Sequence, residues 1–347
     1  MGKRRAGVSV TALSGSSGTS GISLRRAGFG LLTLFLALGC RQEPAPLAHV
    51  TVYFRGEPVE IDFVVSDASQ LNIAAGLVGA EVSRLDEKYD PLNSGGELYL
   101  LNQERTSRDP EMFQLVQRAL DISELTGGHY NLFMAYPQTA YGFDKLYPRP
   151  PTAELLKQIM LPIRRATMTA VAEGPLVRMP NDAYGISLSG LLEGHIVDQA
   201  LAHLKMAGVQ QARVQMGAYW SFGPSPDGLG WPVAITHPID ETVAAQLFLE
   251  NVGMATASVT DQAYTFHNEV YYNNLDPISG QPARMLMSAT IIAPTTELAG
   301  TLAKAIFTML PSEGIYLINQ MPEVEGLLVD AGGRLWQSDS LVTWRED

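Results

Sequence analysis

The sequence predicts an α+β fold, built as one large domain or as two closely joined ones. The chain has 347 residues, of which 46% are apolar and 17% are charged, so it can bury a sizeable core. Segments that favour β-strands form predicted hairpins in some places and single short strands in others, and helical segments lie between them. This mixture of hairpins and helices favours an α+β fold over a regular array of βαβ units.

The first elements are defined by apolar spacing and by helix caps. Residues 50–65 contain two β-type runs and predict two strands. Residues 67–88 place apolar side chains at helical spacing and predict a helix. In the next predicted helix, Asp109 is the N-cap, Pro110 takes the first helical position, and the glycines at 127–128 end it.

The remaining elements follow from the same signs. Residues 89–102 are a predicted loop, and a third helix is expected to start at Thr152. A helix over 191–206 is stopped by Gly208. We also expect strands at 212–216, 231–238, 247–251 and 288–294, a helix at 296–309 and a hairpin at 326–338.

The N-terminal 39 residues have the pattern of a secretion signal. They contain five basic residues and no acidic one, and their apolar run from Ala27 to Leu38 has 12 residues. A bilayer core needs about 20 apolar residues, so this run is too short for a permanent transmembrane helix. The sequence therefore predicts a signal peptide at 1–39.

Cys40, the only cysteine, follows this segment directly. Gly39 before it resembles the residue of a bacterial lipobox, in which the cysteine is acylated. The alternative is ordinary signal cleavage beside an incidental cysteine, but lipidation supplies a reason for an unpaired thiol in an exported protein. We expect a lipidated cysteine and tether at 40–49, and a protein anchored in the bacterial cell envelope that faces the periplasm.

Charge and motifs exclude several functions. The net charge is −12 and becomes −17 once the five leader charges are removed, which disfavours binding to nucleic acid. No His-x-x-x-His, Cys-x-x-Cys, Walker A or Gly-x-Ser-x-Gly motif is present. The segment "ISLSGLLEGHIVD" (186–198) is typical of a strand that turns into a helix and presents its N–H groups to a phosphate, yet Glu193 places a negative charge there.

Five segments, in order, resemble the ApbE family of FAD:protein FMN transferases, from about Val52 to Asp330. They are "YDPLNSGGELYLLN", "ELTGGHYNLFMAYPQTAYGF", the block that begins "ISLSGLLEGHIVD", "YYNNLDPISGQPA" and "ATIIAPTTELAGTLAKAIFTMLPSEG". The resemblance implies an ApbE-like fold of mixed sheets packed with helices over residues 50–340. It also implies an enzyme that binds FAD and Mg²⁺ and transfers FMN to a Ser or Thr hydroxyl of an acceptor flavoprotein.

The resemblance also assigns site residues. It places catalytic positions at Asp276 and Asn273, and metal positions at Leu192 through its backbone carbonyl, at Gly300 and at Lys304. The flavin-binding positions are Glu97, Ser189, Gly190, Glu193, Gly217, Tyr219, Trp231 and Asp276.

Several of these residues depart from the family pattern. The family's metal-binding Asp and Thr fall on Gly300 and Lys304, which cannot ligate Mg²⁺. Its Lys in the glycine turn falls on Glu193, its His before the Asp-Pro pair on Asn273, and its Asp after the central strand on Tyr219. These departures predict impaired catalysis and make Mg²⁺ binding doubtful.

Three functions therefore stay open. The first is a transferase whose metal is held by other oxygens, with Asp276, Glu297 and Asp198 as candidates, although the last two also suit structural roles in helices. The second is a lipid-anchored, non-catalytic homologue that binds flavin or a flavoprotein. The third is a structural lipoprotein.

The opposite changes of charge at Glu193 and Lys304 suggest a compensating contact. We expect the two side chains to form an ion pair in the emptied metal cavity, and the alternative is that both point into solvent.

Overall fold

The computed structural model describes residues 9–12, 47–143, 145–164, 169–171, 175–180 and 185–341, with the backbone alone at 9–12 and 169–171. Except for the short strand β1 (Ser9–Ala12), the predicted signal peptide lies outside these residues, and so does Cys40. Within the described ranges, no helix has the length and apolar character needed to cross a membrane.

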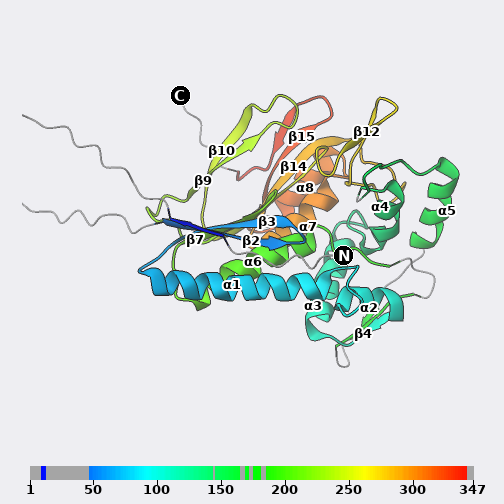
Figure 1. The fold of residues 1–347 in the computed structure, drawn as a ribbon. Helices are drawn as coiled ribbons and strands as arrows, with labels where there is room; N and C mark the ends of the chain where they lie inside the picture. Colours follow the sequence, from blue (N-terminus) through cyan, green and yellow to red (C-terminus); the bar gives the residue numbers. More distant parts are fainter. Residues whose placement is uncertain are drawn as a thin grey trace, which may run out of the picture.

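A nine-stranded antiparallel sheet forms the centre of the fold (Figure 1). Its order is β1-β2-β3-β7-β8-β11-β14-β15-β16, so β3 and β7 lie side by side although about 150 residues separate them. The strand bounds are β2 (Leu47–Phe54), β3 (Glu57–Val64), β7 (Ala212–Met216), β8 (Tyr219–Phe222), β11 (Val252–Ser258), β14 (Leu286–Ala293), β15 (Glu325–Asp330) and β16 (Leu335–Gln337).

The two faces of this sheet are covered differently (Figure 1). Four helices pack on one face: α1 (Ala68–Tyr89), α6 (Leu191–Met206), α7 (Thr296–Ile306) and α8 (Pro311–Gln320). The hairpin of β9 (Trp231–Thr236) and β10 (Val243–Leu249) covers part of the other face. Met254 lies in the core under the hairpin and Ala255 in the core under the helices, as the alternation of side chains along a strand requires.

A smaller layer of short elements lies at one end of the sheet. It contains α2 (Glu97–Glu104), β4 (Thr106–Ser107), α3 (Pro110–Leu125), η1 (Leu132–Met134), α4 (Ala135–Tyr141), α5 (Ala153–Ile163), β5 (Thr169–Val171), β6 (Leu176–Arg178), β12 (Tyr264–Phe266) and β13 (Glu269–Tyr271). Tyr141 and Phe143 stack on each other with ring centroids 5.5 Å apart, and Phe143 lies 5.5 Å from Tyr264. These rings join α4 to the β12–β13 hairpin.

The α+β fold is confirmed, and so are most of the predicted elements. The helix over 191–206 and the strand over 212–216 have their predicted bounds, whereas the helix expected to reach Met309 ends at Ile306. The predicted loop at 89–102 is wrong in its second half, because α2 starts at Glu97 and buries Leu98 and Leu101. Helices α4 and α8 and strands β4, β8, β11, β12 and β13 were not predicted.

A charged cluster ties α6 to α3 and α7. His195 is buried, with Nδ1 2.9 Å from Oε2 of Glu297 and Nε2 3.5 Å from Oε1 of Glu111. Burial opposes the protonation of His195, but its hydrogen bonds to Glu111 and Glu297 outweigh burial and raise its pKa. Burial likewise opposes ionisation of both carboxyl groups, but their hydrogen bonds, above all the one to His195, outweigh burial and lower the pKa of each.

These opposite shifts predict a maximum in the pH dependence of folding stability. The contribution of His195 is fully present below its ordinary pKa of about 6.5 and is lost as the pH rises through its raised pKa. The contributions of Glu111 and Glu297 are present above about pH 4.5 and are lost as the pH falls. Urea unfolding should therefore give the highest stability between about pH 4.5 and 6.5, and the loss above it should be smaller in H195Q. The same alkaline loss in H195Q as in the wild type would contradict this assignment.

Candidate functional site

The glycine turn before α6 is closed by one of the chain's own carboxylates. Gly190 caps the helix with a φ of +87°, and its N–H donates to Oε2 of Glu193 at 2.6 Å. A carboxylate that binds back to the cap from the third helical position stabilises the helix, and its charge suits the positive end of the helix dipole. Glu193 therefore occupies the position that an anion would take at this turn.

Gly300 on α7 packs directly against this turn. A Cβ atom at residue 300 would overlap the carbonyl oxygen of Gly190 and would lie 2.7 Å from Cε1 of Tyr219. A Cβ atom at Gly190 would lie 2.7 Å from Cγ of Lys304. Because the two backbones approach so closely, a carboxylate side chain at residue 300 has no room here.

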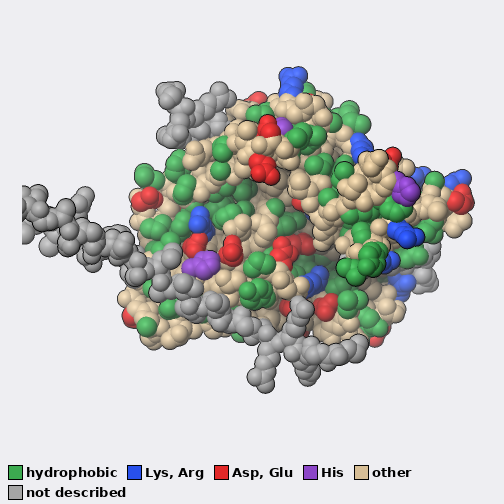
Figure 2. Space-filling view, turned by 45° about the horizontal axis from the view of Figure 1, so that its top comes forward, with side chains coloured by type: hydrophobic (Ala, Val, Ile, Leu, Met, Phe, Trp, Pro, Cys, Tyr) green, Lys and Arg blue, Asp and Glu red, His purple; other side chains and the backbone are tan. Residues whose placement is uncertain are grey.

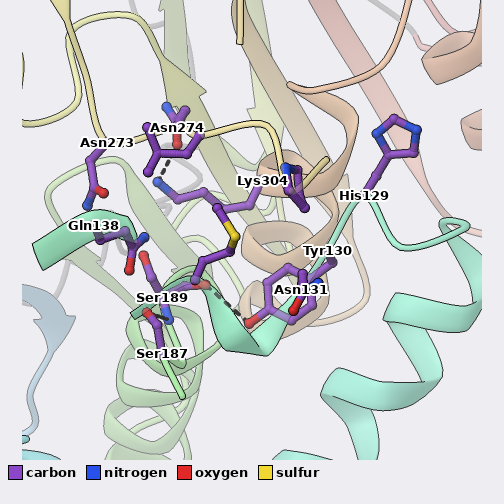
Figure 3. Close-up of a pocket in the computed structure, with 12 residues that line it drawn as sticks. His129, Tyr130, Asn131, Gln138, Ser187, Ser189, Asn273, Asn274 and Lys304 are labelled. Carbon is purple, nitrogen blue, oxygen red and sulfur yellow. Dashed lines mark hydrogen bonds between the residues drawn. The ribbon is translucent and has the colours of Figure 1, made fainter. Parts of the chain in front are cut away.

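The predicted ion pair between Glu193 and Lys304 is wrong. Nζ of Lys304 donates to Oδ1 of Asn274 at 2.6 Å and lies 3.6 Å from Oδ2 of Asp261. Lys304 lies one helical turn after Gly300. Its side chain runs beside Gly190 and reaches the segment that carries Asn274 (Figure 3). The carboxylate of Glu193 stays on the cap of its own helix instead.

The residues at the metal positions do not fit Mg²⁺. Gly300 has no side-chain oxygen, and the ammonium group of Lys304 repels a cation. Leu192 is buried in the first turn of α6 and has only a backbone oxygen to offer. In the part of the chain that the structure describes, no three His, Cys, Asp or Glu side chains gather into a metal site.

The two helical acids proposed as replacement ligands have structural contacts. Asp198 accepts hydrogen bonds from the backbone N–H of Thr296 at 3.1 Å and of Glu297 at 2.9 Å, and so holds the start of α7. Burial raises the pKa of Asp198. Glu297 pairs with Arg118 and His195. These contacts account for both carboxylates without a metal.

The two predicted catalytic residues lie three residues apart in one loop but have different partners. The carboxylate of Asp276 accepts hydrogen bonds from the N–H of Ile278 at 2.9 Å and from Oγ of Ser279 at 2.6 Å, which stabilises the turn. Nδ2 of Asn273 donates to Gln262 at 2.7 Å, and its Oδ1 is buried without a hydrogen-bond partner. Asn273 thus brings an unpaired acceptor to the site.

Three predicted flavin-binding residues have identifiable structural roles. Glu97, at the start of α2, accepts a hydrogen bond from Oγ of Ser107. Nε1 of Trp231 donates to the carbonyl of Gly223 at 3.1 Å inside the hairpin core. Gly217 has a φ of +55° and allows the tight turn between β7 and β8.

A polar pocket, here called the Lys304 pocket, brings other predicted residues together (Figure 3). Its volume is about 40 Å³, and no Asp or Glu lines it. Ser189, Asn273 and Lys304 are the predicted site residues in its wall. The remaining polar wall includes Tyr130, Asn131, Gln138, Ser187 and Asn274.

A larger cleft lies beside this pocket, between the β9–β10 hairpin and the sheet. Its volume is about 630 Å³, and its wall includes Trp220, His237, Met254 and Asp261. Since Asp261 lines the cleft and lies 3.6 Å from Nζ of Lys304, the cleft and the Lys304 pocket meet at this ion pair.

Sequence reasoning missed several residues of these cavities. Tyr130, Asn131 and Gln138 lie in "ELTGGHYNLFMAYPQTAYGF", a segment that resembles the family but contains none of the predicted site residues. Asn274 likewise lies in "YYNNLDPISGQPA". Asp261 carries no pattern in the sequence that would have marked it.

Comparison with known proteins decides the family. A family model described as the ApbE family matches residues 49–328. The chain belongs to the ApbE family. Among curated relatives, it is 22% identical to the FAD:protein FMN transferase of Treponema pallidum over 251 residues, which cover 67% of this chain and 69% of that protein. It is 24% identical to the Rhodobacter capsulatus FAD:protein FMN transferase over 294 residues, which cover 81% of this chain but only 55% of that longer protein.

Solved structures of ApbE proteins share the fold of this ApbE-family chain. The ApbE protein of Thermotoga maritima superposes with a TM-score of 0.76 at 21% identity, and the match covers 85% of this chain and 97% of that one. The flavin transferase ApbE of Vibrio cholerae gives 0.70 at 22% identity, with 86% and 98% covered. The ApbE-like fold expected from the sequence is therefore confirmed.

Proposed function

We propose that this protein is a lipid-anchored ApbE-family protein of the bacterial cell envelope that binds a flavin nucleotide and is impaired in magnesium-dependent FMN transfer. Family membership supports the flavin nucleotide as ligand and an acceptor flavoprotein as partner. The proposed impairment rests on the contact of Gly300 with the Gly190 turn. Beside this contact, the side chain of Lys304 points into a polar pocket.

The larger cleft is the place proposed for the flavin. Ligand pockets typically have volumes of about 300–1,000 Å³, and the cleft has about 630 Å³. Trp220 and Met254 give its wall apolar surface, as a flat ring system requires. His237 and Asp261 supply polar groups.

The remaining side chains support binding better than transfer. Transfer of FMN to a hydroxyl group needs charge stabilisation at the pyrophosphate and an acceptor for the hydroxyl proton. A bound divalent cation would supply the first, but Gly300 and Lys304 do not fit one. Asn273 cannot take up a proton, and the carboxylate of Asp276 is bound within its own turn.

Fluorescence titration of the purified protein with FAD, with Mg²⁺ and with EDTA, tests this proposal. We expect saturable binding of similar affinity in both buffers. Binding of FAD that requires Mg²⁺ would favour an intact transferase site, and no binding would favour a structural lipoprotein.

Acylation of Cys40 is a separate prediction. We expect the mature N-terminal peptide to carry the mass of a lipidated cysteine, and the protein to fractionate with membranes in the wild type but not in C40S. A soluble periplasmic protein with an unmodified Cys40 would contradict it.

A further inference from the structure

The Lys304 pocket has the composition of an anion site within an acidic protein. The chain has a net charge of −12, yet no carboxylate lines this pocket. Its charged wall residue is Lys304, whose side chain is 16% exposed, and the rest of its polar wall consists of neutral groups and His129. Figure 2 shows Lys and Arg side chains gathered at the end of the molecule formed by α4 and α5, which borders the pocket through Gln138. The charge of the wall residues themselves therefore favours an anion.

The ammonium group of Lys304 has capacity for a ligand. It carries three donors, and the hydrogen bond to Oδ1 of Asn274 uses one of them. Asp261, at 3.6 Å, is an ion-pair partner beyond hydrogen-bonding distance. This carboxylate is itself held by Nδ2 of Asn274 at 2.9 Å and by the N–H of Ser258 at 3.1 Å. Asp261 therefore neutralises the ammonium only in part and occupies none of its hydrogen-bond donors.

The other walls suit a phosphate group that is attached to a hydroxylated chain. The hydroxyl groups of Ser187 and Ser189 are donors in the wall, and Figure 3 shows them on the side of the pocket opposite Asn274. Oδ1 of Asn273 is buried without a partner and is an acceptor for a ligand hydroxyl. Lys304 and the serines match phosphate oxygens, and Asn273 matches a neighbouring hydroxyl group.

We propose that the Lys304 pocket binds the single phosphate group of flavin mononucleotide and does so without a divalent cation. This inference rests on the proposed flavin binding. A cavity of about 40 Å³ is of the order of one phosphate group or one to two water molecules, and far below the size of a flavin ring system. The ammonium supplies one tethered positive charge, which suits one phosphate group.

The test compares ligands that differ by the phosphate group. Flavin mononucleotide and riboflavin are titrated into the purified wild-type protein and into K304Q, with Mg²⁺ and with EDTA. K205Q is the matched control, because Lys205 is exposed in the last turn of α6 and its loss changes the net charge equally. D261N removes the carboxylate that competes for the ammonium.

The wild type is expected to bind flavin mononucleotide about tenfold or more tightly than riboflavin, equally in both buffers. K304Q should lose this advantage while keeping its riboflavin affinity, K205Q should retain the advantage, and D261N should increase it. An advantage that requires Mg²⁺, or one that persists in K304Q, would overturn the inference and leave flavin binding intact.

A titration with inorganic phosphate tests the anion pocket independently of flavin binding. A phosphate-induced shift of the Lys304 ammonium resonance, with no binding of either flavin, would keep an anion pocket but remove the flavin from the proposal. No binding of phosphate or of either flavin would overturn both.

Discussion

Purified protein incubated with FAD and Mg²⁺ is expected to release AMP about a thousandfold more slowly than a metal-dependent family member assayed beside it. A bound metal supplies several kcal/mol of transition-state stabilisation in phosphoryl transfer, and each ~1.4 kcal/mol is a factor of ten in rate. Gly300 has no room for a carboxylate, and the metal position after it carries the ammonium of Lys304. Chromatographic detection of AMP over time measures the rate.

The control for this assay is chelation. Residual release that EDTA leaves unchanged agrees with the account, because no resident metal takes part. Rapid release that EDTA abolishes would show that other oxygens hold a metal, and the proposed impairment would then be wrong.

Substitution of Gly300 is expected to have the second large effect. An added Cβ atom would overlap the carbonyl oxygen of Gly190 and press against the ring of Tyr219. Overpacking of this kind typically costs about 1–3 kcal/mol, so G300A should lower the free energy of unfolding although alanine favours helices. Urea unfolding measures the change.

Gly76 on α1 provides the matched control for this substitution. It also lies inside a helix, but a Cβ atom there would meet nothing within 4 Å. G76A should therefore stabilise the protein by about 0.5–1 kcal/mol. Equal stabilisation by G300A and G76A would show that the contact between α7 and the Gly190 turn is looser than described.

The parts of the fold that the sequence predicted are those with strong local patterns. Gly208 and apolar spacing defined α6, and Asp109 with Pro110 defined the start of α3. Helix α2 was missed because it has only eight residues and follows two glycines, so its stability comes from packing of Leu98 and Leu101 and not from a local signature. The neighbouring positions of β3 and β7 depend on tertiary pairing that no local pattern contains.

The site was less predictable, because it depends on side-chain direction. The resemblance placed Glu193 and Lys304 near one cavity and suggested that they pair. It did not indicate the nearer partners. Glu193 accepts a hydrogen bond from the backbone at the cap of its own helix, and Lys304 contacts Asn274 and Asp261. Charge signs alone therefore predicted the wrong pair, because short-range hydrogen-bond geometry determines which oppositely charged groups meet.

We propose that glycine packing and a lysine have replaced a metal site in this chain. Titration of Mn²⁺, followed by its electron paramagnetic resonance, tests this most directly on protein saturated with FAD, with FAD alone as the reference. We expect that the protein adds no saturable Mn²⁺ site beyond the weak binding of Mn²⁺ by FAD itself. One tightly held equivalent of Mn²⁺ per protein would contradict it.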